Sequence, residues 1–171
     1  MIDIRHVYQT FGDRHILKDV SLSIKEGETM VILGASGSGK STLLKLIIGL
    51  LRPTSGKVLV NGKDMGQLSE EEMNEERRSM GMVFQYSALF DSLNVKENVA
   101  FGLRMHTRLS EEEIDAIVKE KLHLVGLDGI EDLMPANLSG GMKKRVSLAR
   151  AIALEPKLIL YDEPTAGLDP I

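Results

Sequence analysis

A run of glycine, serine and lysine residues near the N-terminus carries the clearest chemistry in this sequence. It fits the spacing G-x-x-x-x-G-K-[ST] and stands between two apolar stretches, residues 30–33 and 43–50. Glycines let successive backbone N–H groups turn into one concavity, and a helix beginning near Lys40 adds the positive end of its dipole. A polyphosphate fits there, with Lys40 on the β- and γ-phosphates and the Ser41 hydroxyl on Mg²⁺. The candidate residues are Gly34, Ala35, Ser36, Gly37, Ser38, Gly39, Lys40, Ser41 and Thr42.

The alternative for this run is a Gly/Ser-rich loop that only caps a buried helix. A strand, a glycine loop and a helix, in that order, are the setting that the phosphate-binding motif requires. The sequence offers all three, because residues 30–33 are apolar and residues 41–51 are apolar on most helical faces. We therefore predict a nucleotide site between a strand at 30–33 and a buried helix at 41–51.

Two adjacent acids, Asp162 and Glu163, stand at the end of the strand expected at residues 157–163, which is otherwise largely apolar. Ligands of open α/β sheets bind at the carboxyl ends of the strands. Neighbouring side chains that leave a strand diverge, so two roles are predicted. Asp162 is placed to hold the Mg²⁺ shell, and Glu163 is a candidate general base for an attacking water. The alternative is a pair of surface acids entering a turn.

Ser139, Gly140 and Gly141 offer a hydroxyl, unencumbered backbone N–H groups and the start of a helix. They are a candidate second phosphate-binding element, and the alternative is an ordinary helix cap with a glycine hinge. Two such elements suggest a shared site, in which one protomer supplies Lys40 and Glu163 and the other supplies Ser139 and Gly141.

Composition limits the possible partners. The 171 residues are 43% hydrophobic and 27% charged, which is ordinary for one soluble domain. A net charge of -4 does not favour duplex nucleic acid, and the absence of cysteine rules out disulfides and thiolate metal sites. There is no basic N-terminal region before an apolar core and no apolar run long enough to span a membrane. Any membrane association is expected to go through a partner.

The elements that must position these residues form an α/β pattern. An antiparallel β layer is expected first, and a polar helix begins after Ser69, which forms a capping box with Glu72. Three further local signals are a stop for the helix at 41–51 beginning at Arg52–Pro53, an Asn61–Gly62 turn after the strand at 57–62, and a capping box of Ser110 and Glu113 for the helix at 110–124. Residues 1–85 and 154–171 are predicted to form a nucleotide-binding core, interrupted by a helical subdomain at residues 86–153. The expected strands are residues 2–7, 16–24, 57–62, 81–84 and 157–163, and the expected helices of the subdomain are residues 95–105, 110–124 and 138–154.

Five motifs, in this order and spacing, resemble those of ABC-type ATPase subunits over nearly the whole chain. They are residues 34–42, Gln85, residues 138–142, residues 158–163 and residues 166–169. The resemblance implies a P-loop NTPase core with an antiparallel β layer and an inserted helical subdomain. It also implies a head-to-tail dimer with two ATP molecules, each held by Lys40 of one chain and Ser139 of the other.

Three further roles come from the resemblance alone. Gln85 would touch Mg²⁺ and the attacking water, and would couple the site to membrane-spanning partners through the segment that follows it. Asp169 would lie across the dimer interface near the opposite phosphate loop. Phe11 aligns with the aromatic residue that stacks on adenine, and the alternative for Phe11 is core packing.

The sequence departs from the family pattern at Met142, where a glutamine is usual. Met142, residues 88–93 and residues 97–101 resemble the corresponding positions of the ATPases that work with MCE-type lipid-binding proteins. Those ATPases move phospholipids or other hydrophobic compounds between bacterial membranes. This resemblance implies a permease partner and a peripheral position on the cytoplasmic face of the inner membrane.

A second departure concerns the switch histidine that the family carries about 30 residues past the strand expected here at residues 157–163. The four histidines of this sequence all lie upstream of that place, so we expect the C-terminal part of the core to be missing. A polypeptide of residues 1–171 is then predicted to bind ATP poorly or hydrolyse it slowly.

Two other functions remain open on the sequence. One is a soluble ABC ATPase without a permease, serving repair, translation or iron–sulfur assembly. The other is a nucleotide-sensing module that does not catalyse hydrolysis.

Overall fold

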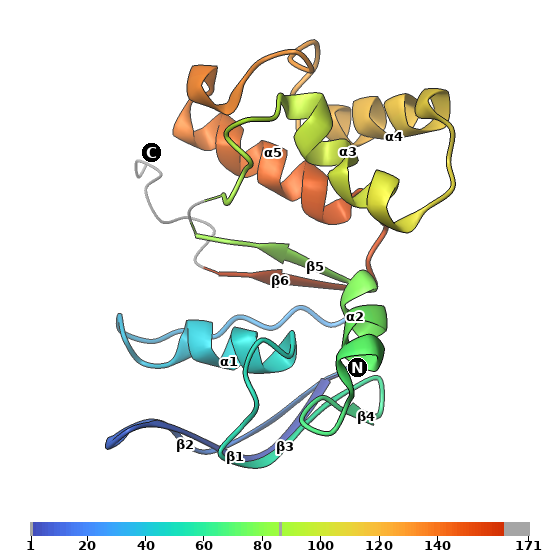
Figure 1. Ribbon diagram of the computed structural model, residues 1–171. Coiled ribbons are helices and arrows are strands. Elements are labelled where there is room, and N and C mark those ends of the chain that lie inside the picture. Colours follow the sequence, from blue (N-terminus) through green and yellow to red (C-terminus); the bar gives the residue numbers. More distant parts are fainter. Residues whose placement is uncertain (1, 86, 163–171) are drawn as a thin grey trace. The chain divides into compact units, whose positions relative to one another are not determined.

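The computed structural model describes residues 2–85 and 87–162, and it divides into two compact units, Met1–Arg77 and Arg78–Ile171 (Figure 1). The elements of the first unit are β1 (Ile2–Phe11), β2 (Arg14–Ile24), α1 (Lys40–Ile47), β3 (Ser55–Val60), β4 (Lys63–Asp64) and α2 (Glu70–Arg78). Those of the second unit are β5 (Met80–Val83), α3 (Val95–His106), α4 (Glu111–Leu124), a 3₁₀ turn (Pro135–Asn137), α5 (Gly140–Ile152) and β6 (Leu158–Tyr161).

The first unit contains the predicted antiparallel β layer, with strand order β2-β1-β3-β4 (Figure 1). Ile2 and Ile4 alternate toward the buried face of β1, as the sequence pattern indicated. Val7 is also buried although it breaks this alternation, because the register with β2 slips by one residue between Ile4 and Val7. His6 lies in this β-bulge with φ 47°, so the bulge turns the following side chain back to the core. The bulge was not predicted.

Helix α1 is shorter than the predicted helix at residues 41–51. Gly49 adopts φ +72°, its N–H donates to the Leu46 carbonyl at 3.2 Å, and the Leu50 N–H donates to the Lys45 carbonyl at 2.8 Å. These two bonds form a Schellman motif, which ends the helix before the Arg52–Pro53 pair that the sequence suggested as the stop. The expected burial of the helix is confirmed for Leu43, Leu46 and Ile47.

The strand predicted at residues 30–33 is not present. These residues take part in no ladder with any other described residue, and Val31 and Leu33 are 74% and 88% exposed. A strand forms only when a neighbour accepts its backbone N–H groups and donates to its carbonyls. The apolar pattern alone was therefore not sufficient to create one.

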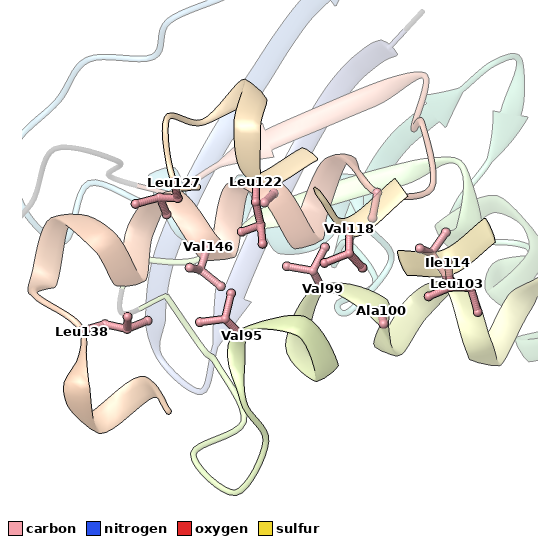
Figure 2. Packing of buried hydrophobic residues seen from close by; sticks show 12 residues of the cluster. Val95, Val99, Ala100, Leu103, Ile114, Val118, Leu122, Leu127, Leu138 and Val146 are labelled. Atoms are coloured by element: carbon pink, nitrogen blue, oxygen red, sulfur yellow. The ribbon is translucent and has the colours of Figure 1, made fainter. Parts of the chain in front are cut away.

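The second unit pairs β5 with β6 in parallel, and α5 packs on β5 (Figure 1). Helices α3, α4 and α5 enclose an apolar core in which side chains from all three point toward one another (Figure 2). The predicted capping box of α4 is confirmed, since Ser110 and Glu113 each bond the other's backbone. The predicted division of the chain into residues 1–85 plus 154–171 and residues 86–153 stays a prediction.

Candidate functional site

The loop at residues 34–42 connects an extended exposed segment to α1. Its bend is closed by the N–H of Ser38, which donates to the Ala35 carbonyl at 3.2 Å. Gly37 and Gly39 adopt φ +76° and φ +100°, conformations that L side chains rarely take. Residues 34–38 are exposed, so the backbone of this bend faces solvent.

Gly39 fixes the point where the loop becomes helix. It is buried against β2, and a Cβ at this position would lie 2.7 Å from Cδ2 of Leu17 and 3.1 Å from Cγ2 of Ile16. Only a glycine combines this φ with this close approach. The β layer of the same unit therefore determines where α1 begins.

Lys40 folds its ammonium group back over the loop. Nζ donates to the carbonyl oxygen of Gly34 at 2.9 Å and to that of Ala35 at 3.1 Å. The cation therefore lies at the mouth of the bend formed by the preceding glycines, where it can meet a negatively charged group.

The N-terminus of α1 presents positive potential to the same region. Its N-cap Gly39 supplies no side-chain acceptor, and its first turn contains no acidic residue. The first backbone N–H groups of a helix attract anions, and the Lys40 ammonium adds a full charge. The glycine bend, the helix start and Lys40 together fit a phosphate group, and Ser41 in the first turn of α1 has the hydroxyl that Mg²⁺ ligation requires.

Gln85 and Asp162 lie at one edge of the parallel β5–β6 pair. The Asp162 N–H donates to the Val83 carbonyl at 3.0 Å, and Val83 is the β-partner of Tyr161. Gln85 follows two residues after Val83, so both candidate Mg²⁺ ligands leave the sheet at its carboxyl edge, where ligands of parallel sheets bind. Among the residues that the structure describes, no three His, Cys, Asp or Glu side chains are grouped so that they could hold a metal ion by themselves. Mg²⁺ commonly uses only one or two carboxylates beside phosphate oxygens.

Ser139 is the predicted N-cap of α5. Its hydroxyl accepts a bond from the Met142 N–H at 3.2 Å, so the helix-cap alternative describes its contact in this structure. Gly140 is exposed and a Cβ there would meet no heavy atom within 4 Å, while Gly141 is half-buried. No acidic residue occupies the first turn, so this helix start is also suited to an anion.

The remaining candidates are distributed as follows. Phe11 ends β1 beside the turn to β2 and is 47% exposed, which does not fit core packing. Glu163 and Asp169 lie outside the described residues.

In the described part of the chain, none of the helices has the length and apolarity needed to cross a bilayer.

Sequence reasoning missed two residues that hold the segment following Gln85. Arg150 of α5 bonds the carbonyls of Ser87 and Ala88, and Asn98 of α3 bonds backbone groups of residues 90–94. The available signal was a polar residue within an apolar helical stripe, since Asn98 stands beside Val95 and Val99.

Comparison with known proteins places the chain in a family. Residues 17–166 match the protein family described as "ABC transporter". The probable ribonucleotide transport ATP-binding protein mkl of Mycobacterium leprae is 50% identical over 170 residues, 99% of this chain and 49% of that protein. The intermembrane phospholipid transport system ATP-binding protein MlaF of Haemophilus influenzae is 49% identical over 171 residues, 100% of this chain and 65% of that protein. The chain thus spans about half to two-thirds of the length of these relatives.

A solved structure gives the same result. The dimeric ATP-binding cassette MJ0796 in a post-hydrolysis state, bound to ADP and Pi, matches with a TM-score of 0.91 and 38% sequence identity, covering 99% of this chain and 76% of that one. The family match extends over most of the chain, and the fold match over nearly all of it. The chain belongs to the ABC transporter family.

Proposed function

We propose that this chain is the ATP-binding and ATP-hydrolysing part of a protein that powers an ABC transporter of phospholipid or another hydrophobic compound. The observation that carries the proposal is the loop at residues 34–42, in which two left-handed glycines, the start of α1 and the Lys40 ammonium converge. Such a loop is suited to the phosphates of a nucleotide.

The roles of the individual residues belong to the proposal. Lys40 binds the β- and γ-phosphates, and Ser41, Gln85 and Asp162 are the Mg²⁺ ligands. Mg²⁺ neutralises charge on the phosphate oxygens. Glu163 accepts the proton of the attacking water.

The rest of the site is proposed from the resemblance and the relatives. Phe11 stacks on adenine, and Ser139, Gly140, Gly141 and Asp169 contact the nucleotide across a head-to-tail dimer. A permease partner, with an MCE-type substrate-binding protein, holds the dimer at the cytoplasmic face of the inner membrane. The name of MlaF states phospholipid transport and that of mkl states ribonucleotide transport, and the resemblance at Met142 favours the lipid.

The proposal is tested with the protein as its own cell produces it, not with a polypeptide restricted to residues 1–171, and with the Glu163→Gln variant of that protein. We expect wild type to hydrolyse ATP, and Glu163→Gln to retain ATP in a stable dimer on size-exclusion chromatography, because the nucleotide binds but the base is lost. Glu112→Gln, at an exposed position in the first turn of α4, is the matched control and should behave as wild type. No nucleotide binding by wild type would overturn the proposal, and binding without turnover would favour a nucleotide sensor.

The transport part has its own experiment. We expect a membrane protein to co-purify with the chain, and ATP to drive movement of a labelled phospholipid rather than a labelled ribonucleotide in reconstituted vesicles. Turnover without a membrane partner would instead indicate a soluble ABC ATPase.

A further inference from the structure

The segment that follows Gln85 makes an unusual bend. Ser87 and Ala88 adopt φ 57° and φ 47°, so two consecutive residues with side chains take the left-handed conformation. This conformation is strained for a residue with a side chain, and it persists only where surrounding contacts hold it. The Ser87 N–H donates to the Phe84 carbonyl at 3.1 Å, which closes the bend next to Gln85.

Arg150, in the last turn of α5, stabilises this bend through two hydrogen bonds. Its Nη1 donates to the Ala88 carbonyl at 2.9 Å and its Nη2 to the Ser87 carbonyl at 3.2 Å, and its guanidinium carbon lies 5.7 Å from the centre of the Phe90 ring. Burial disfavours the charged form of the guanidinium and lowers the pKa of Arg150. Two carbonyl oxygens and a ring face offset that cost.

Asn98, in α3, holds the other end of the segment. Its Nδ2 donates to the carbonyls of Phe90 at 3.1 Å, Leu93 at 2.9 Å and Asn94 at 3.0 Å, and its Oδ1 accepts the Phe90 N–H at 2.8 Å. The side chain is fully buried. The segment from Ser87 to Asn94 is thus fastened to two helices of the same unit.

The helix that carries Arg150 is the one that begins at Ser139. Helix α5 is continuous from Gly140 to Ile152, so its two ends move together. We propose that Arg150 is a positioning residue that links α5, which begins at Ser139, to the bend at Ser87 and Ala88. A displacement of the N-terminus of α5 would then alter the conformation of this bend, which lies beside Gln85. The inference rests on the proposed function for the role of Gln85. It adds a named mechanical connection between two parts of the site.

Arginine is required by this geometry. Lysine at position 150 would keep the charge, but it lacks the planar two-nitrogen fork that directs Nη1 to the Ala88 carbonyl and Nη2 to the Ser87 carbonyl beside the Phe90 ring. Arg145 offers a matched control on the same helix, because its Nη1 also donates to two successive carbonyls, those of Val125 at 3.3 Å and Gly126 at 3.0 Å. That contact lies after α4 and involves no residue of the bend.

Amide hydrogen exchange, measured without nucleotide on the protein as its own cell produces it, tests whether Arg150 stabilises the bend at Ser87 and Ala88. Arg150→Lys should raise exchange roughly tenfold at the hydrogen-bonded amides of Ser87, Phe90 and Leu93, since charge-assisted bonds are lost, with the amides of α4 unchanged. Arg145→Lys should act only near Gly126. Unchanged exchange at residues 87–93 in Arg150→Lys, or an equal rise throughout the second unit, would overturn the proposal.

A rescue variant keeps the test decisive if Arg150→Lys loses overall stability. Ala88→Gly removes the cost of the left-handed conformation at an exposed position, so the double variant should recover part of the lost protection. A bend that Arg150 does not hold would show no such recovery. Unfolding followed by circular dichroism identifies any variant that is globally destabilised.

Kinetics test the link to the site. Arg150→Lys should lower kcat for ATP about tenfold with KM within twofold of wild type, because its bonds lie in the second unit whereas Lys40 belongs to the first. An unchanged kcat, or an equal loss for Arg145→Lys, would overturn the link. If wild type binds no nucleotide, the proposed function and this link fail together, while the exchange experiment still decides whether Arg150 holds the bend.

Discussion

The ammonium nitrogen of Lys40 lies 2.9 Å from the carbonyl oxygen of Gly34, six residues earlier in the chain. This contact closes the loop on itself and keeps the cation at the bend. A phosphate carries more negative charge than a carbonyl, so it would attract the same ammonium more strongly. The proposed ATP site therefore makes a direct prediction about this residue.

Lys40→Ala should weaken ATP binding by roughly 10- to 100-fold, the loss expected for a charge-assisted hydrogen bond. Binding is measured with a fluorescent nucleotide on the natively produced protein. Lys45→Ala is the control, because Lys45 is exposed in the last turn of the same helix. Equal affinity of Lys40→Ala and wild type would contradict a phosphate role for the loop.

Gly39→Ala should destabilise the protein by about 1–3 kcal/mol. The new Cβ would be strained at φ +100° and would collide with Leu17. Gly37→Ala separates the two causes, since Gly37 also has positive φ but a Cβ there would meet no atom within 4 Å. Chemical unfolding followed by circular dichroism should give a smaller loss for Gly37→Ala. Equal losses would mean that the contact with β2 does not fix the start of α1.

Local rules predicted the features that depend on local interactions. The capping boxes at Ser69 and Ser110 were confirmed, because each needs only residues three positions apart. The Asn61–Gly62 turn was confirmed for the same reason, with φ values of 51° and 82° that allow the tight connection from β3 to β4.

Features that depend on distant partners could not be predicted. The segment at residues 30–33 has a strand-like apolar pattern, but strand formation depends on a neighbour that the pattern does not specify. Arg150 contacts residues more than 60 positions away, and no spacing rule connects it to Ser87 or Ala88. The phosphate loop was recognisable in advance because its glycines, lysine and serine are contiguous.

Arg104 of α3 should contribute stability that depends on pH. It bonds Glu97 and Glu111, and its N–H groups lower the pKa of the Glu111 carboxyl below the ordinary value of 4.5. A lowered carboxyl pKa adds stability above the unfolded-state value, and this stability is lost as pH falls through the folded-state value.

Arg104→Met should therefore lower Tm by roughly 1–3 °C at pH 7, with the difference from wild type shrinking below about pH 4.5. Arg108→Met, at an exposed arginine four residues later, is the control. Thermal unfolding at pH 7, 5 and 3.5 gives the measurement. A difference that stays constant down to pH 3.5 would mean that the methionine acts through packing and not through the loss of the Glu111 pair.

Asn98→Ala should cost about 2–4 kcal/mol of unfolding free energy, since it removes four hydrogen bonds of a fully buried side chain, among them those to the Phe90 N–H and the Leu93 carbonyl. Asn94→Ala is the matched comparison. The Asn94 Oδ1 accepts the Glu97 N–H at 2.8 Å as the cap of α3, and losing such a cap costs about 1 kcal/mol. Urea unfolding followed by circular dichroism suits a chain without tryptophan. If the two variants lose the same stability, the hydrogen bonds of Asn98 contribute no more than an ordinary helix cap.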